Sequence, residues 1–283
     1  MTSSPNTTIK KSLCICIDDF GLYPSINEAV LKLVDIGRVH AVSCLVGGQV
    51  CAQGAASLLG RAQSHVDIGL HLDFTECSIN SSNRHSIASL ILKSHSGLLN
   101  RSAVRLEIRA QLDRFEKLFN RPPKFIDGHL HVHQFPVIRS ELINEIKRRY
   151  ADNKPWIRST RSAAQNQVPK LSAAQKIKPF VIEITGASQL LSLLTNQGYR
   201  HNQDFAGVYD FAGGEPIFAK NLQHWLASIS QGGLLMTHPG TGIDSTDLAH
   251  QSRQAEFNVM TSRKFDQWIA SHNIELKAMS QII

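Results

Sequence analysis

The chain has 283 residues, a formal net charge of +7 and a hydrophobic content of 42%. This length suits one large α/β domain or two small ones, and the hydrophobic content is ordinary for a globular protein with a sizeable core. No apolar run reaches the ~18 residues that a membrane-spanning helix needs, so no membrane span is expected.

The N-terminal stretch is rich in Ser, Thr and Asn and lacks the apolar core of a signal peptide. We therefore expect a flexible segment over residues 1–11, one folded domain over residues 12–283 and a cytoplasmic location. The five cysteines are odd in number and form no CxxC pair, which agrees with a reduced compartment. Cys14 and Cys16 lie two apart in an apolar run and are expected to share a buried face.

The positive charge is spread along the chain rather than concentrated in one segment. Its densest groupings, Lys147–Arg149 and the pair Arg158 and Arg161, are not interleaved with aromatic residues. A platform for single-stranded nucleic acid combines both features, so no nucleic-acid partner is expected.

Short apolar runs alternate with helix-period segments along the chain. The predicted strands are Leu13–Ile17, Ala41–Val46, Val66–Leu72, Phe125–Ile126, Trp156–Arg158, Phe180–Ile184, Gly233–Thr237 and Glu275–Met279. The predicted helices are Ile26–Ile36, Val104–Phe119, Pro136–Arg149, Ser188–Asn196, Pro216–Ile229 and Arg253–His272. Ser78–Asn100 and Gln197–Glu215 are predicted to be long loops. The alternation predicts an α/β fold in a single domain: an irregular, TIM-like (β/α) barrel of mainly parallel strands, with an open doubly wound sheet as the alternative.

Polar residues collect where the predicted strands end. Asp18 and Asp19 follow the first strand, His71 lies at the end of the third, Asp127 follows the fourth and His238 follows the Gly233–Thr237 run. Parallel barrels build their active sites at the carboxyl ends of the strands, so we expect these distant residues to converge.

Three histidines alternate in the segment that follows Asp127. In an extended segment His129, His131 and His133 would all face one side. Because imidazole is a poor core filler, this pattern favours metal binding or catalysis over packing.

One aspartate and two histidines make an ordinary site for a single divalent cation that keeps positions open for water. Such an ion lowers the pKa of its bound water to about 7. A second carboxylate beside the site can take the proton of that water, and a histidine on the far side can protonate a leaving group. The chain contains all of these parts.

Four motifs resemble the YdjC-type (ChbG/HpnK) carbohydrate deacetylases in order and spacing. They are Asp18–Gly21, Gly69–Leu72, the run Asp127–His133 followed by Phe135 and Pro136, and His238–Gly240. The resemblance covers the chain from about Leu13 to Gly240. It implies an irregular (β/α) barrel and a hydrolase that depends on a divalent metal and removes acetyl groups from N-acetylated sugars.

The resemblance also implies roles for single residues. The positions that match the family's metal ligands are Asp19, His71 and His129, for one divalent ion, Mg²⁺ or Zn²⁺. Asp18 matches its proton acceptor, Arg158 resembles the arginine that positions the acidic residues, and His238 resembles its general acid. His131 or His133 is expected to orient a ligand by a hydrogen bond.

The segment Asp73–Cys77 departs from the more apolar sequence that relatives often carry. The identity of the sugar is therefore left open between a chito-oligosaccharide and a glycolipid sugar.

Three other functions also stay open. The spare histidines suit a metallophosphoesterase with a second metal ion. A 2-His-1-carboxylate iron oxygenase would give no role to Asp18 or His238. A sugar-binding protein without activity would not need a base beside the metal. A homodimer is left open.

Overall fold

The computed structural model describes residues 10–163, 182–242, 244 and 246–283. Its sheet has eight strands in the order β5-β4-β3-β2-β1-β7-β6, with β8 paired to β1. The strands are β1 (Lys11–Phe20), β2 (Ala41–Cys44), β3 (Asp67–Leu72), β4 (Phe125–Gly128), β5 (Trp156–Ile157), β6 (Asp204–Ala206), β7 (Gly233–Thr237) and β8 (Ile274–Leu276). All pairings are parallel.

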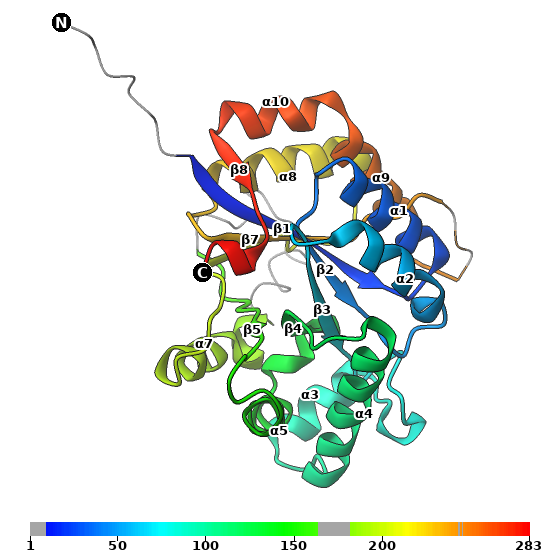
Figure 1. The fold of residues 1–283 in the computed structure, drawn as a ribbon, viewed down its shortest axis with the longest axis vertical. Coiled ribbons are helices and arrows are strands. Elements are labelled where there is room, and N and C mark those ends of the chain that lie inside the picture. The colour runs from blue at the N-terminus through cyan, green and yellow to red at the C-terminus, as the bar shows by residue number, and fades with distance from the viewer. Residues whose placement is uncertain (1–9, 164–181, 243, 245) are drawn as a thin grey trace, which may run out of the picture.

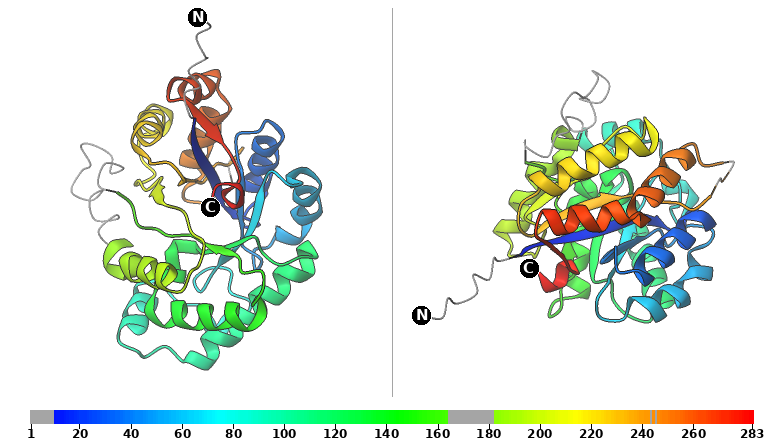
Figure 2. Two further views of the ribbon diagram at one scale, coloured as in Figure 1. Left: turned by 60° about the vertical axis from the view of Figure 1, so that its left-hand side comes forward. Right: turned by 90° about the horizontal axis from the view of Figure 1, so that it is seen from above.

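The helices lie outside this curled sheet (Figures 1 and 2). They are α1 (Pro24–Asp35), α2 (Cys51–Ala62), α3 (Ile87–His95), α4 (Arg101–Phe119), α5 (Pro136–Arg149), α7 (Ser188–Asn196), α8 (Gly214–Ser228), α9 (His250–Thr261) and α10 (Arg263–Ser271). None of the helices in the described ranges is long and apolar enough to cross a membrane. The predicted irregular, mainly parallel (β/α) barrel is confirmed.

The two faces of the sheet bury different sets of side chains. Along β1, Leu13, Ile15 and Ile17 belong to the main core, which the helices complete. The alternate residues Cys14 and Cys16 point into the barrel, so the prediction that they share a buried face is confirmed. Their interior cluster is completed by Ala41, Phe125, Trp156, Phe205, Leu234, Met236 and Met279.

The interior of the barrel is packed tightly around one aromatic pair. The rings of Phe125 and Trp156 stack with centroids 4.3 Å apart. Gly69 makes room for this pair, because a Cβ there would lie 2.4 Å from the Phe125 ring. The Trp156 Nε1 donates to Asp67 Oδ2 over 2.9 Å and thereby ties β5 to β3 at the amino-terminal end of the sheet.

In the part of the chain that the structure describes, the barrel closes without a strand ladder at one seam. No strand pairing joins β5 to β6 within the described residues. The Ile157 amide instead donates to the Arg200 carbonyl, and the buried Asn202 side chain bonds both the amide and the carbonyl of Ser159. One backbone hydrogen bond and an asparagine side chain therefore take the place of a strand ladder here, which makes the barrel irregular.

Several predicted elements were wrong. The predicted loops contain α3 and β6, and α2 was not predicted. The predicted helix Arg253–His272 is divided at Ser262, whose extended backbone separates α9 from α10. Within the predicted strand Phe180–Ile184, residues 180 and 181 lie outside the described residues, and the rest is helical and leads into α7. Likewise, residues 1–9 of the expected N-terminal segment are not described, and β1 begins at Lys11.

Candidate active site

A β-bulge in β1 brings two adjacent carboxylates to one site. Ile17 pairs with Val42 and Phe20 pairs with Cys44, so β1 holds one more residue than β2 over this interval. Asp19 has a φ of 68°, in the left-handed region that non-glycine residues seldom adopt. We predicted that the strand would end before Asp18, which is wrong. It continues to Phe20, and the bulge turns both carboxylates toward the same centre.

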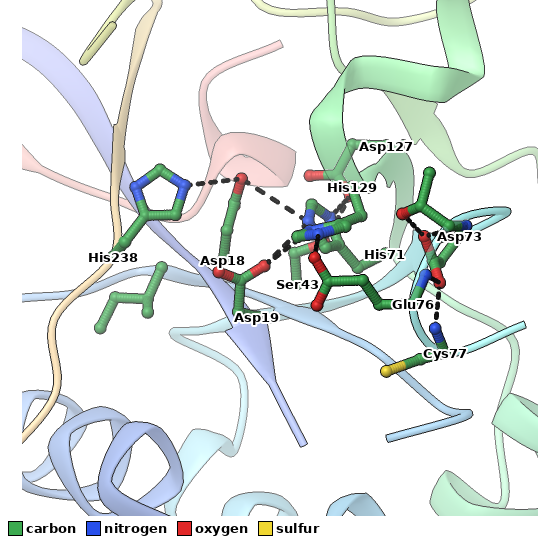
Figure 3. A network of polar contacts seen from close by, with 12 residues as sticks. Asp18, Asp19, Ser43, His71, Asp73, Glu76, Cys77, Asp127, His129 and His238 are labelled. Carbon is green, nitrogen blue, oxygen red and sulfur yellow. Dashed lines mark hydrogen bonds and ion pairs between the residues drawn. The ribbon is translucent and has the colours of Figure 1, made fainter. Parts of the chain in front are cut away.

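Asp19, His71 and His129 form a compact set of metal-ligand atoms. The ligand atoms of the three residues lie within 4.8 Å of one another, and all three side chains are buried. Asp19 Oδ1 lies 3.0 Å from His129 Nδ1 and 3.4 Å from His71 Nε2. Figure 3 shows the three side chains converging from β1, β3 and the turn after β4.

Asp127 fixes the orientation of the His71 ring. The His71 Nδ1 lies 2.7 Å from Asp127 Oδ1 and 2.9 Å from the Ser43 hydroxyl. With the Nδ1 proton donated to Asp127, Nε2 is the ring nitrogen that faces Asp19. Burial disfavours a charged imidazole, but Asp127 and Asp18 outweigh it and raise the pKa of His71 to about 9. The negative charges of Asp127 and Asp18, which stabilise the protonated form of the imidazole, also favour a metal cation.

Arg158 holds Asp18 in place from inside the barrel. Its guanidinium is fully buried, and its two terminal nitrogens each lie 2.6 Å from a different Asp18 oxygen. The same group contacts Asp127 Oδ2 at 2.6 Å and Cys16 Sγ at 3.0 Å. Such bidentate contacts fix the position of a carboxylate and also compensate its negative charge.

The three alternating histidines do not share a face, so that prediction was wrong. The segment His129–Gln134 forms a 3₁₀ turn in which Leu130 and His131 have φ values of 51° and 60°. His129 reaches Asp19, the ring of His131 meets Phe205 edge-on, and His133 Nε2 lies 3.0 Å from the Arg158 carbonyl. The expected ligand-orienting contact is therefore made by Asp127 at His71 rather than by His131 or His133.

The segment after β3 supplies a further carboxylate. Glu76 Oε1 lies 3.4 Å from His129 Nε2. The buried Asp73 carboxylate accepts hydrogen bonds from the amides of Thr75, Glu76 and Cys77 and so folds this segment toward the site. The departure from the family pattern at Asp73–Cys77 therefore lies beside the predicted metal ligands.

Helix α9 contributes a second arginine. Arg253 donates to Asp19 Oδ2 over 2.8 Å and to Asp247 Oδ2 over 2.9 Å. Burial opposes ionisation of Asp19, but the charge of Arg253 and the contact with His129 hold its pKa well below the usual range. Asp19 therefore presents Oδ1 to the two histidines while Oδ2 is held by Arg253.

His238 lies across the site from the two imidazoles. Its Nε2 is 4.0 Å from Asp18 Oδ2 (Figure 3). Burial lowers the pKa of His238 to about 4, because Asp19 and Asp18 offset only part of the desolvation. The ring is consequently neutral near pH 7 before a ligand enters.

A cavity of about 640 Å³ opens over these residues. This volume is within the range of small-molecule sites. Its polar floor contains Asp18, Asp19, His71, His129, His238 and Arg253. Its walls are mainly apolar and include Leu22, Ile87, Ile91, Leu130, Phe135, Val208, Phe211 and Leu248.

The fold and the site together define a (β/α)-barrel protein with a carboxylate–imidazole centre at the carboxyl ends of its strands. The chain belongs to the YdjC-like protein family, whose sequence profile matches residues 12–271. The membership expected from the four motifs is thus confirmed.

Two relatives are similar to this chain over different shares of its length. A carbohydrate deacetylase from Mus musculus is 27% identical over 95% of this chain and 94% of its own length. A chitooligosaccharide deacetylase from Serratia marcescens is 32% identical over 46% of this chain and 53% of its own.

Solved structures share the fold. A protein from Enterococcus faecalis described as a cellobiose-phosphate cleavage protein has a TM-score of 0.68 and 19% identity, covering 96% of this chain and 99% of its own. A peptidoglycan N-acetylglucosamine deacetylase has a TM-score of 0.54 and 10% identity, covering 97% and 88%.

The structure brings all six predicted site residues together. The residues that we did not assign to the site are its supports, chiefly Ser43, Asp127, Arg253 and Glu256. Asp127 belongs to a motif that we singled out, but its pairing with His71 depends on the register of β3 and β4. Arg253 and Glu256 lie outside every motif, on a helix that reaches the site only through the fold.

Proposed function

We propose that this protein is a carbohydrate deacetylase that hydrolyses the amide bond of an N-acetylated sugar and releases acetate. The observation that carries the proposal is the different setting of two adjacent carboxylates. Asp19 Oδ1 lies 3.4 Å from His71 Nε2 and 3.0 Å from His129 Nδ1. Both oxygens of Asp18 are instead held by Arg158, and its Oδ2 lies 3.9 Å from His71 Nε2 and 4.0 Å from His238 Nε2. One carboxylate is therefore placed to hold a metal ion and the other to move a proton. The full-length similarity to the mouse carbohydrate deacetylase supports this activity.

Asp19, His71 and His129 would hold one divalent cation, and their donor set fits such an ion. The two imidazoles suit Zn²⁺, while Mg²⁺ would bind with more water ligands. When bound, the cation supplies Lewis-acid stabilisation of the negative charge that develops on the acetyl oxygen.

Asp18 is the proposed general base. It takes a proton from water as the water oxygen forms a bond to the acetyl carbon. Arg158 fixes both Asp18 oxygens, so the carboxylate meets the water without first losing rotational freedom. The expected contribution of such a base is a factor of about 10²–10⁴ in rate.

His238 is the proposed donor to the leaving group. Because its ring is neutral near pH 7 and its Nε2 lies 4.0 Å from Asp18 Oδ2, it can receive the proton that Asp18 took from water. It then donates this proton to the amide nitrogen as the bond between carbon and nitrogen breaks. The products are the free amine of the sugar and acetate.

A phosphoesterase with two metal ions fits less well. The second cluster of metal-competent groups, Cys16, Asp18 and Asp127, surrounds the guanidinium of Arg158. A cation placed there would meet a buried positive charge. The arrangement favours a single metal ion.

The test is acetate release from N-acetylglucosamine and chito-oligosaccharides by metal-stripped protein after addition of Zn²⁺, Mg²⁺, Mn²⁺ or Co²⁺. Asp18→Asn should retain the metal and lose turnover, and His129→Ala should lose both. Asp67→Asn, which changes a buried aspartate at the opposite end of the barrel, is the matched control. Full activity in either site variant would contradict the proposed roles. Tight metal binding without acetate release from any sugar would direct attention to phosphoester and oxygenase assays.

A further inference from the structure

We propose that Glu256 is a positioning residue, which holds His238 where it can pass a proton to the leaving amine. This inference rests on the proposed role of His238. Glu256 lies on α9, is fully buried and does not reach the floor of the cavity, so it acts through its neighbour.

The imidazole of His238 is not oriented by a hydrogen bond from its own Nδ1. That atom is buried and has no partner in the part of the chain that the structure describes. The ring packs edge-on against Phe211, with centroids 5.0 Å apart. The position of the ring therefore depends mainly on the backbone that carries it.

Glu256 fixes this backbone. Its Oε2 accepts a hydrogen bond of 2.6 Å from the His238 amide, and its Oε1 accepts one of 2.6 Å from the Tyr209 hydroxyl. Both carboxylate oxygens are thus used, one on each of two chain segments that line the cavity.

A second residue of α9 contacts the next peptide unit, on the carboxyl side of His238. Arg253 Nη1 lies 3.4 Å from the His238 carbonyl, and the Arg253 carbonyl accepts from the Gly240 amide over 3.0 Å. One turn of α9 therefore contacts the backbone on both sides of the His238 side chain. A loop that follows a strand would otherwise be among the more mobile parts of a barrel.

The chemistry of Glu256 is unusual for a residue that only fills space. Burial raises its pKa to about 7, although the Tyr209 hydroxyl, the His238 amide and Arg253 pull it downward. A buried carboxyl is costly compared with an apolar side chain of similar size. Its two hydrogen bonds to cavity-lining segments explain its presence.

The experiment compares Glu256→Ala and Glu256→Gln in the metal-loaded enzyme, with the N-acetylated sugar that gives the most acetate as substrate. Glu256→Ala should lower kcat about 10–100-fold, because displacements near 1 Å cost about this much, with KM and the metal Kd changed less than about threefold. Glu256→Gln retains an oxygen for the His238 amide and should recover kcat to within about threefold. Glu145→Ala removes another buried carboxylate, one that pairs with Arg109 and Arg148, and should leave kcat unchanged.

A double-mutant cycle separates a role through His238 from a general structural role. In a His238→Ala background, Glu256→Ala should cause no further loss beyond about twofold. An equal loss in both backgrounds, a change in KM alone or an unchanged kcat in Glu256→Ala would overturn the inference. Full turnover in His238→Ala would instead refute the proposed role of His238 itself, so the two failures are distinguishable.

Discussion

Replacing Asp127 by asparagine tests whether the support of His71 sets the affinity of the metal site. Asp127 is fully buried, with one oxygen 2.7 Å from His71 Nδ1 and the other 2.6 Å from Arg158. The Asp127→Asn substitution would keep the shape of the side chain but remove its charge. If the new amide nitrogen turned toward the ring, it would present a donor to the Nδ1 proton.

The size of the effect follows from these contacts. Loss of a carboxylate that orients a ligating histidine typically lowers metal affinity about 10–100-fold, or about 1.4–2.7 kcal/mol. Arg158 would keep both contacts with Asp18, so its buried charge stays paired. The free energy of unfolding should therefore fall by less than the roughly 3–5 kcal/mol that accompanies a fully broken buried pair.

Isothermal titration of the metal-stripped protein with Zn²⁺ measures the affinity directly. Asp67→Asn is the control, because Asp67 is a buried aspartate on the same strand as His71 that bonds Trp156 and Ser280 instead. We expect a weaker Kd in Asp127→Asn and an unchanged Kd in Asp67→Asn. Equal affinities in Asp127→Asn and the wild-type protein would refute the reasoning, as would equal losses in the two variants.

Three further predictions concern stability. Gly69→Ala should lower the free energy of unfolding by about 1–3 kcal/mol in urea titrations, because its Cβ would meet the Phe125 ring at 2.4 Å; full stability would show that the interior can move aside. Burial raises the folded-state pKa of Glu256 from 4.5 to about 7, so the native protein loses stability relative to Glu256→Gln as pH rises from 4.5 to 7. The variant should be more stable by up to about 3 kcal/mol at pH 8 and by little at pH 4.5, and a pH-independent difference would contradict this pKa. Chelation of a cation present at 100 times its Kd should remove about 2.7 kcal/mol of stabilisation and lower Tm by several degrees; the same shift in Asp19→Asn would mean that the cation binds elsewhere.

The parts of the fold that could be predicted were those with a long or regular pattern. The predicted helices Pro136–Arg149 and Ser188–Asn196 match α5 and α7 from end to end. In contrast, β6 has three residues, too few for a period to appear, and α2 is rich in alanine and glycine. Pairing with β7, rather than local propensity, decides a strand as short as β6.

The candidate site could be predicted as a set of residues but not as a geometry. We expected polar residues at the ends of the predicted strands to converge, and this correctly selected Asp18, His71 and His238 as neighbours. The reason is that parallel strands end at one edge of the sheet. The 3₁₀ turn that separates His131 from His129 could not be predicted, since alternating residues fit an extended strand equally well. Its residues Leu130 and His131 adopt left-handed backbone angles, which no local pattern of the sequence indicates.

The bulge at Asp19 makes the site sensitive to the number of residues in β1. In a regular strand, neighbouring side chains face opposite ways, so substitution alone could not place two consecutive acids in one centre. The extra residue between Ile17 and Phe20 removes this restriction and leaves the outward-facing residues before and after it in register with β2. A one-residue deletion in this interval would send one acid toward the helices, a loss that no single substitution at a neighbouring site could repair.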